Sequence, residues 1–376
     1  MLNASLAGAI SECRQHSRIS AIYGATHGAD GLVAGLFEDL SRLDDESLAH
    51  LAQAPGSALG SARRKFEPGD FEKMIEGFRA RGVRYLFYTG GNGSMETAMR
   101  MDAFARQAGY ELYVIGIPKT IDNDLAGTDH TPGYASCARF FAHAVRDVGM
   151  DNRALPPPIE VIEILGRNTG WLVAATALAR HFADDPPHLI YFPECGVSAD
   201  QLCADVERVY RHRGRCLVAV CEGQTDERGG WFDAELGTKP GARDPLPANM
   251  GHVLAKMLWA RTGIRARAEK PGLIGRSCAA LASDVDRDEA WRCGQAAVRA
   301  AVAGESGKMV AIQRAAGTPY TSHMELTPLD QVAGIVRAFP REWIAPGHND
   351  VTAEFVEWAR PIVGTVSPHF RLPQRA

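Results

Sequence analysis

Several features that mark other classes of protein are missing from this sequence. No run of eighteen apolar residues occurs, which excludes an ordinary membrane-spanning helix. The first residues also lack the basic stretch and following apolar run of a secretory signal. We therefore expect a cytoplasmic protein that does not bind a membrane.

The cysteines and histidines lack the spacing of a metal site. No Cys-x-x-Cys pair and no paired histidines are present, so we interpret the cysteines as reduced thiols rather than zinc ligands or disulfides. His27, His130 and His181 have no ligand spacing around them, and we interpret them as surface or core residues. The eight cysteines are Cys13, Cys137, Cys195, Cys203, Cys216, Cys221, Cys278 and Cys293.

An excess of positive charge is missing as well. The net charge is −4 and the pI is about 6.3, which gives no electrostatic basis for binding nucleic acid or anionic lipid. Lysine is scarce, and 34 of the 41 basic residues are arginine. Arginine abundance alone therefore indicates nothing, and only arginines inside a motif are informative. Internal repeats and low-complexity tracts are also absent.

What the sequence does contain is an alternation of apolar runs and helical patterns, which predicts parallel sheets covered on both faces. With 376 residues and 45% apolar content, the chain is long enough for a large core and two lobes. Residues 54–60 and 226–244 are rich in turn formers and predict exposed loops. The expected strands are 19–23, 84–89, 112–117, 159–165, 188–192 and 216–222. The expected helices are 4–16, 70–80, 95–107, 135–149, 170–182 and 198–212.

A glycine-rich motif, Gly90-Gly91-Asn92-Gly93-Ser94, directly follows the expected strand 84–89. Three glycines in four positions let the backbone turn sharply and approach a ligand. We expect Ser94 to cap a helix over 95–107, whose amino terminus attracts an anion such as phosphate. The alternative is an ordinary strand-to-helix turn without a ligand.

A second motif, Pro118-Lys119-Thr120-Ile121-Asp122-Asn123-Asp124, follows the expected strand 112–117. It lies at the carboxyl end of that strand, where open α/β sheets bind ligands. Asp122 or Asp124 could accept a hydroxyl proton or hold Mg2+, and Lys119 could neutralise a moving phosphoryl group. A polar turn is the alternative, but turn chemistry calls for neither the lysine nor the second carboxylate. Together the two motifs indicate phosphoryl transfer to a hydroxyl.

These motifs, with others further along the chain, resemble the phosphofructokinase family in order and spacing, over nearly the whole sequence. The further motifs are Gly127-Thr128-Asp129, Glu163-Ile164-Leu165-Gly166-Arg167, Gly170-Trp171, Pro193-Glu194, Glu222-Gly223 and Gly275-Arg276-Ser277. The resemblance implies an α/β fold of two lobes, with doubly wound, mostly parallel sheets and flanking helices. It implies a phosphate-donor lobe at 1–132, a sugar-phosphate lobe at 133–300, and C-terminal helices at 301–376 that return to the donor lobe.

The resemblance also implies the reaction and the roles of individual residues. The substrate would be fructose 6-phosphate, phosphorylated at its C1 hydroxyl with Mg2+, by a homo-oligomer for which we expect a dimer. Asp122 matches the general base, and Lys119, Thr120 and Asp124 complete the catalytic set. The residues that match the donor-phosphate site are Gly91, Asn92, Gly93, Ser94 and Arg63. The residues that match the sugar-phosphate site are Thr120, Asp122, Leu165, Gly166, Arg167, Glu222, Arg267 and Arg276. The metal ligands would be Asn92, Asp122 and Asp124.

The residues at three positions bear on the phosphoryl donor. Lys119 resembles the pyrophosphate-dependent branch of the family and favours pyrophosphate. Gly93 stands where that branch commonly has an aspartate that excludes ATP, so this obstacle to ATP is absent. Asn92 replaces a more usual aspartate, which resembles one bacterial pyrophosphate subgroup and removes a potential magnesium ligand. We expect pyrophosphate as the donor rather than ATP.

Three departures from the family pattern leave alternatives open. The family begins with a strand and a Gly-rich loop before the segment that starts here at Leu2, so we expect a fold that lacks its first strand. Pro158 replaces a basic residue, and Leu273 replaces a histidine or tyrosine near the sugar. The alternatives are an ATP-dependent kinase of fructose 6-phosphate or a related sugar phosphate, and a catalytically weak sugar-phosphate-binding protein. Asp122 and Asp124 argue against the last.

Overall fold

A computed structural model of the chain describes residues 1–156, 158–230, 232 and 249–370. The chain folds into two compact units, each built from separate segments. The first unit comprises Met1–Thr120, Asp124–Gly133 and Asp284–Val336, and the second comprises Ile121–Asn123, Tyr134–Ser283 and the residues from Arg337 onward. Most of the expected loop 226–244 lies outside the described residues.

The main sheet of the first unit has four strands in the order β10-β9-β4-β3. Strands β3, β4 and β9 are parallel, and β10 runs antiparallel along the edge. Residues 23–25 and 37–39 form a separate two-stranded antiparallel sheet, β1-β2. The elements are α1 (Leu2–Cys13), β1 (Tyr23–Ala25), α2 (Ala29–Ala34), β2 (Phe37–Asp39), α3 (Asp45–Gln53), α4 (Asp70–Arg81), β3 (Tyr85–Gly90), α5 (Asn92–Gln107), β4 (Tyr113–Pro118), α10 (Asp284–Val302), β9 (Lys308–Arg314), β10 (Ser322–Pro328) and the 3₁₀ turn η4 (Leu329–Gln331).

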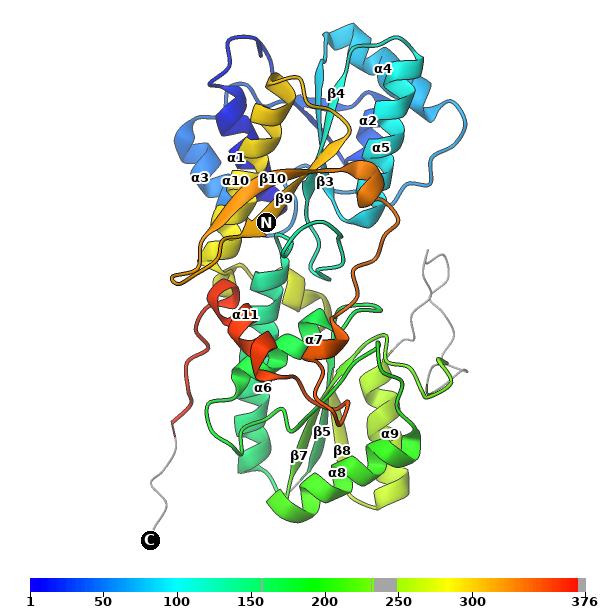
Figure 1. The fold of residues 1–376 in the computed structure, drawn as a ribbon, viewed down its shortest axis with the longest axis vertical. Helices are drawn as coiled ribbons and strands as arrows, with labels where there is room; N and C mark the ends of the chain where they lie inside the picture. The colour runs from blue at the N-terminus through cyan, green and yellow to red at the C-terminus, as the bar shows by residue number, and fades with distance from the viewer. Residues whose placement is uncertain (157, 231, 233–248, 371–376) are drawn as a thin grey trace. The chain divides into compact units, whose positions relative to one another are not determined.

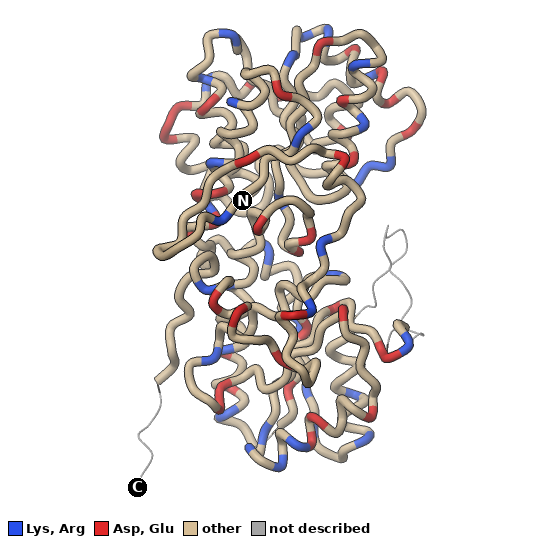
Figure 2. The backbone as a smooth tube through the Cα atoms, viewed as in Figure 1, with Lys and Arg blue, Asp and Glu red and all other residues tan. Residues whose placement is uncertain are grey.

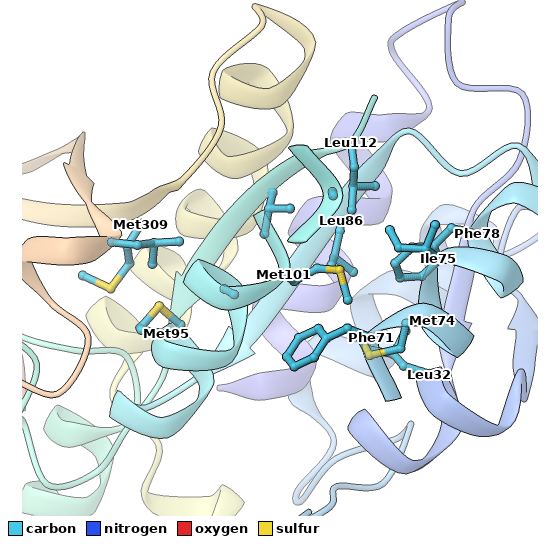
Figure 3. Close-up of a cluster of buried hydrophobic side chains, with 14 of the residues drawn as sticks. Leu32, Phe71, Met74, Ile75, Phe78, Leu86, Met95, Met101, Leu112 and Met309 are labelled. Atoms are coloured by element: carbon cyan, nitrogen blue, oxygen red, sulfur yellow. The ribbon is translucent and has the colours of Figure 1, made fainter. Parts of the chain in front are cut away.

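Helices cover both faces of this sheet, as the buried strands require (Figure 1). Along β4, Val114 faces the core shared with α4 and α5, while Ile115 and Ile117 face the core shared with α10. Figure 3 shows the first of these cores, in which Phe71 and Met74 of α4 and Met101 of α5 are buried near Leu86 of β3. Alternate strand residues therefore serve opposite layers.

Two glycines allow α1 and α10 to pack closely. A Cβ on Gly8 would lie 2.1 Å from the carbonyl oxygen of Trp291, and a Cβ on Gly294 would lie 2.1 Å from that of Ser5. Each helix therefore needs glycine where the backbone of the other approaches. Helix α1 starts at Leu2, and no strand precedes it among the described residues.

The second unit contains a fully parallel sheet in the order β6-β7-β5-β8. Its strands β5 and β7 are buried along their whole length. Helices α8 and α9 pack on one face through an apolar core that includes Val161, Val218, Leu202 and Leu254. The elements are α6 (Tyr134–Ala154), β5 (Ile159–Ile164), α7 (Trp171–Ala175), η1 (Thr176–Ala179), β6 (Leu189–Tyr191), α8 (Ala199–Arg213), β7 (Cys216–Cys221), α9 (Met250–Thr262), β8 (Ala266–Glu269), η2 (Gly272–Arg276), η3 (Ala279–Leu281), η5 (Arg341–Trp343) and α11 (Ala353–Val363).

The structure corrects three expectations about these elements. The strand expected at 19–23 is not part of a parallel sheet, because only Tyr23 belongs to a strand and it pairs antiparallel in the β1-β2 sheet. The helix expected at 170–182 is shorter in the structure. Helix α7 ends at Ala175, and the 3₁₀ helix η1 that follows it ends at Ala179. The region 301–376 is not simply a set of helices that return to the first unit. It supplies β9 and β10 to the first unit and α11 to the second.

The distribution of charged residues along the chain agrees with the low net charge. Acidic and basic residues are interspersed along the backbone of each unit (Figure 2). All eight cysteines are free, and six of them are buried. None of the helices in the described ranges combines the length and the apolar character needed to cross a bilayer.

Candidate active site

The Gly-rich motif and the start of the second motif, residues 118–120, lie side by side at the carboxyl ends of neighbouring strands in the first unit. Strands β3 and β4 pair in parallel register, with Gly90 opposite Pro118. The backbone N–H of Lys119 donates to the Gly90 carbonyl at 2.9 Å. A Cβ on Gly91 would lie 3.5 Å from Cβ of Thr120. The Gly-rich loop therefore contacts the segment that carries Lys119 and Thr120.

Helix α5 begins three residues earlier than expected. Its N-cap is Gly91, in an extended conformation, and no side chain caps it. Ser94 is therefore not the cap. It lies in the first turn, where its Oγ folds over Gly90 so closely that a Cβ there would come within 2.2 Å. Gly93 is exposed in the same turn, so the amino terminus of α5 remains open to an anion.

The side chain of Asn92 contacts the backbone of a distant segment. Its Nδ2 donates to the Ile335 carbonyl at 2.7 Å, and its Oδ1 accepts from the Gly334 N–H at 2.8 Å. This pairing uses an amide as donor and acceptor at once, which an aspartate could not do. Oδ1 keeps a second lone pair, so its suggested role toward a metal or phosphate stays a prediction.

Arg63 is exposed, and within the described residues it forms no hydrogen bond or ion pair with the Gly-rich loop. The neighbouring Arg64 is instead bonded to Asp70 and Asp30. Among the described residues, the structure thus shows no direct polar contact between Arg63 and the other expected donor-side residues.

In the second unit, Asp122 lies against the loop that follows β5. Thr169 Oγ1 lies 3.1 Å from the Asp122 carbonyl oxygen and 3.0 Å from the Gly166 carbonyl oxygen, and these two acceptors share its single proton. The Asp122 carboxylate lies 3.6 Å from Nε of Arg167 and is 15% exposed. The structure therefore brings together the expected base and the expected sugar-phosphate arginine.

Glu222 fixes the same loop from the end of β7. Its Oε1 accepts from the backbone N–H of Arg167 at 3.1 Å and, more weakly, from that of Gly166 at 3.4 Å. A Cβ on Gly223 would lie 1.9 Å from the Arg167 carbonyl oxygen, so this position requires glycine. Leu165 is half-buried at the start of the loop.

Arg167 and Asn123 have unusual backbone conformations. Both have positive φ values, 54° for Arg167 and 56° for Asn123. Asparagine tolerates this region, but arginine rarely adopts it. Such strain persists where surrounding contacts hold it, and it clusters at functional sites.

Arg267 and Arg276 lie on β8 and at the end of η2, and neither is hydrogen-bonded to the loop of Gly166 and Arg167 within the described ranges. Arg267 is in register with Glu160 of β5. Glu160 is 4% exposed, and burial raises its pKa to about 7; Glu269 adds to this effect while Arg267 opposes it. Pro158 is buried and Leu273 is 62% exposed.

Sequence reasoning did not identify Lys270. Its Nζ lies 2.7 Å from Oε1 of the buried Glu163 and donates to Asn249 Oδ1 at 3.2 Å. Two signals could have pointed to it: lysine is rare in this chain, and Lys270 falls between Arg267 and Arg276.

We expect Asp122 and Asp124 to hold Mg2+ together with substrate phosphates. No group of three or more His, Cys, Asp or Glu side chains able to hold a metal occurs within the part of the chain that the structure describes. Mg2+ in phosphoryl-transfer enzymes is commonly held by one or two carboxylates together with substrate phosphates. Asp122 and Asp124 are two residues apart in the sequence, and their role toward Mg2+ stays a prediction.

A Gly-rich loop before a helix, with a lysine at the end of the neighbouring parallel strand, is an arrangement suited to binding phosphate. The sequence profile of the family described as phosphofructokinase matches residues 1–301. The chain belongs to the phosphofructokinase family. It is thus an enzyme that transfers a phosphoryl group to an alcohol.

Individual relatives carry several names. A protein of Rhodospirillum rubrum named pyrophosphate--fructose 6-phosphate 1-phosphotransferase is 39% identical, with 98% of this chain and 92% of the relative covered. A sulfofructose kinase of Alkalicoccus urumqiensis is 30% identical, with coverages of 96% and 92%. The crystal structure of a pyrophosphate-dependent phosphofructokinase from Marinobacter aquaeolei has a TM-score of 0.87 at 30% identity, with coverages of 98% and 90%.

Proposed function

We propose that the chain transfers a phosphoryl group from pyrophosphate to the C1 hydroxyl of fructose 6-phosphate. The observation that carries this proposal is the contact of the Asp122 carboxylate with Arg167, in a loop that Glu222 and Thr169 also hold. A carboxylate beside a sugar-phosphate loop is placed to take a proton from a sugar hydroxyl.

In the proposed reaction, Asp122 takes the C1 hydroxyl proton while the C1 oxygen bonds to the transferred phosphorus. The bond from that phosphorus to the leaving phosphate oxygen breaks. Lys119, Thr120, Gly91, Gly93 and Ser94 bind the donor phosphates. Sugar-phosphate binding is assigned to Leu165, Gly166, Arg167, Glu222, Arg267 and Arg276. Asp122 and Asp124 would hold Mg2+, which neutralises charge on the donor phosphates.

Lys119 supports pyrophosphate as the donor. The hydrogen bond from its backbone N–H to the Gly90 carbonyl keeps a cationic residue next to the Gly-rich loop, where a compact dianionic leaving group needs neutralisation. Two relatives at 39% and 34% identity have names that agree with this donor. Gly93 favours the second candidate, an ATP-dependent kinase, because it adds no bulk or charge to the loop.

The test measures fructose 1,6-bisphosphate formation by the purified chain with Mg2+ and fructose 6-phosphate, in parallel with pyrophosphate and with ATP. Turnover with pyrophosphate alone is expected. Turnover with ATP alone would contradict the donor assignment. A folded protein inactive with both donors would contradict the acceptor, and sulfofructose, the substrate class in one relative's name, is then the acceptor to compare.

We also propose that the enzyme is a homo-oligomer, with a dimer as the expected form. The support is the resemblance to family members that offer a basic residue to the sugar phosphate across a subunit interface. Pro158 stands at one such position here and supplies no charge, so it does not add to this support. Light scattering coupled to size exclusion would give the mass, and a monomer that is fully active would contradict the proposal.

A further inference from the structure

A buried histidine in the first unit is clamped between two carboxylates. His130 is 0% exposed, with Nδ1 2.8 Å from Asp129 Oδ2 and Nε2 2.6 Å from Glu289 Oε2. Asp129 precedes it in the chain, whereas Glu289 comes from α10, 159 residues away. A ring with an acidic acceptor at each nitrogen must donate from both, so His130 is an imidazolium.

Two further side chains complete this group, which we name the His130 cluster: Asp129, His130, Glu289, Arg314 and Tyr320. Arg314 donates to both oxygens of Asp129 at 3.2–3.3 Å, and the Tyr320 hydroxyl donates to Glu289 Oε1 at 2.6 Å. The Arg314 guanidinium also lies over the Tyr320 ring at 4.7 Å. Two cations balance two carboxylates, so the buried cluster is neutral as a whole.

The backbone on each side of the His130 cluster is held in place. Asp129 N–H donates to the Ile312 carbonyl at 2.8 Å, and Ile312 N–H donates to Thr128 Oγ1 at 2.9 Å. Beyond the histidine, Gly133 N–H donates to Asp286 Oδ1 at 2.8 Å. Asp286 and Glu289 are three residues apart on α10, so the first turns of this helix anchor both ends of residues 130–133.

The segment between these anchors contacts the proposed catalytic loop. The hydroxyl of Thr131, which is fully buried, donates to the Thr120 carbonyl at 2.9 Å. Thr120 and Gly133 also form a parallel β-bridge. The backbone that carries Lys119 and Thr120 is therefore supported by the residue next to His130.

We propose that His130 is a positioning residue for phosphoryl transfer. Clamped by Asp129 and Glu289, it fixes Thr131, and Thr131 in turn fixes the carbonyl of Thr120 beside the Gly-rich loop. The proposal rests on the proposed function, in which Thr120 helps hold the transferred phosphoryl group. His130 itself touches no substrate.

The charge state required by this arrangement persists at neutral pH. Burial alone would lower the pKa of His130, but hydrogen bonds and charge attraction from Asp129 and Glu289 outweigh it and raise the pKa to about 9. The same contacts hold the pKa of Asp129 and of Glu289 below their usual ranges. The clamp is therefore fully charged wherever a cytoplasmic enzyme operates.

The first test removes only the link to Thr120. Thr131→Val keeps the shape of the side chain and the whole His130 cluster but deletes the hydroxyl donor. We expect kcat to fall by about 10- to 100-fold while KM for both substrates changes by less than about threefold, because misplacement of a reacting group acts on the transition state. Thr131→Ser, which restores the hydroxyl, should recover most of kcat.

The second test removes the clamp. His130→Gln cannot serve both carboxylates with a positive charge, and it should lower kcat in the same way. If His130 acts through Thr131, the double variant H130Q/T131V should be little worse than H130Q alone. The matched control is His323→Gln, which removes an exposed histidine that pairs with Glu325 in the same unit and should leave kcat unchanged.

A readout independent of activity separates this proposal from the proposed function. Hydrogen exchange measured by mass spectrometry on peptides covering 118–125 should be faster in T131V than in the wild type. Loss of wild-type turnover with every donor would defeat the proposed function only. Unchanged exchange in T131V, or unchanged kcat in both T131V and H130Q with only a lower melting temperature, would overturn the positioning role. If H130Q does not fold, T131V and T131S carry the test.

Discussion

Glu163 of β5 and Lys270 form an ion pair in the second unit. Lys270 Nζ lies 2.7 Å from Glu163 Oε1, and the Gly251 N–H at the start of α9 donates to Glu163 Oε2 at 2.9 Å. Glu163 is 2% exposed, whereas Lys270 keeps 29% of its side chain exposed. The carboxylate inside β5 thus depends on Lys270 for its compensating charge.

Replacing Lys270 with methionine should therefore destabilise the fold. The variant leaves a buried carboxylate without its cation, and we expect the free energy of unfolding to fall by about 1–3 kcal/mol, less than for a fully buried pair because solvent reaches the lysine. Urea denaturation would measure it. Lys256→Met, which changes an exposed lysine on α9, is the matched control.

The companion variant decides whether the loss comes from the pair. In Glu163→Gln/Lys270→Met no charge is left uncompensated, so the double variant should be more stable than K270M alone, with a coupling of about 0.5–3 kcal/mol. Additive effects of the two substitutions would show that Glu163 does not depend on Lys270.

The parts of the fold that could be predicted from sequence are those fixed by local patterns. The apolar runs at 84–89 and 112–117 each end in a turn signal, and β3 and β4 lie within one residue of them. In the structure these two strands end at the same edge of the sheet, where Lys119 lies beside Gly90. The motif residues Asp122, Arg167 and Glu222 also meet in the structure, joined through one loop.

The failures came from contacts between residues far apart in sequence. Ser94 resembled a helix cap, but Gly91 takes that place because Asn92, in the first turn, is bonded to residues 334–335. The pairs Glu163–Lys270 and His130–Glu289 join separate elements. A local sequence pattern does not indicate which distant charged residue will pair with a buried one. The apolar residues near 19–23 did not indicate that only Tyr23 would pair with β2.

Asp122→Asn should abolish most of the activity without unfolding the protein. An amide keeps the size of the side chain but cannot accept the hydroxyl proton, and loss of a general base typically lowers kcat by about 100- to 10,000-fold. Steady-state kinetics with fructose 6-phosphate and the active donor would measure kcat, and a thermal melt would check the fold. Asp200→Asn, which alters an exposed carboxylate paired with Arg261, should leave both unchanged. An active D122N enzyme would remove Asp122 from the catalytic role.

Asn92→Asp should destabilise the first unit although it puts a negative charge at a helix amino terminus. The helix dipole favours that charge by about 0.3–1 kcal/mol. Against this, the carboxylate cannot donate to Ile335 and sets an oxygen against its carbonyl, which costs about 1–3 kcal/mol. We expect a net loss of about 1 kcal/mol in urea denaturation, with Asn92→Ala also destabilised because it loses both hydrogen bonds. An N92D protein more stable than the wild type would show that these bonds contribute little.

Glu160 should make the stability of the second unit depend on pH. Burial raises its pKa to about 7 in the folded protein, above the ordinary value near 4.5, so between these two pH values the folded state holds a proton that the unfolded state has released. The favourable contribution of this proton uptake to the free energy of unfolding is fully present below pH 4.5 and is lost as the pH rises through 7. Glu160→Gln removes this titration.

The stability of E160Q relative to the wild type should therefore increase by about 1–3 kcal/mol between pH 4.5 and pH 8. Using the difference between the two proteins cancels the titration of every other group and the constant effect of the amide. Urea denaturation across that range measures it, and Glu76→Gln, an exposed position on α4, should show no such trend. If the difference between E160Q and the wild type is the same at both pH values, burial does not raise the pKa of Glu160 in the folded protein, and Arg267, its neighbour across the strands, offsets the cost of burying its charge.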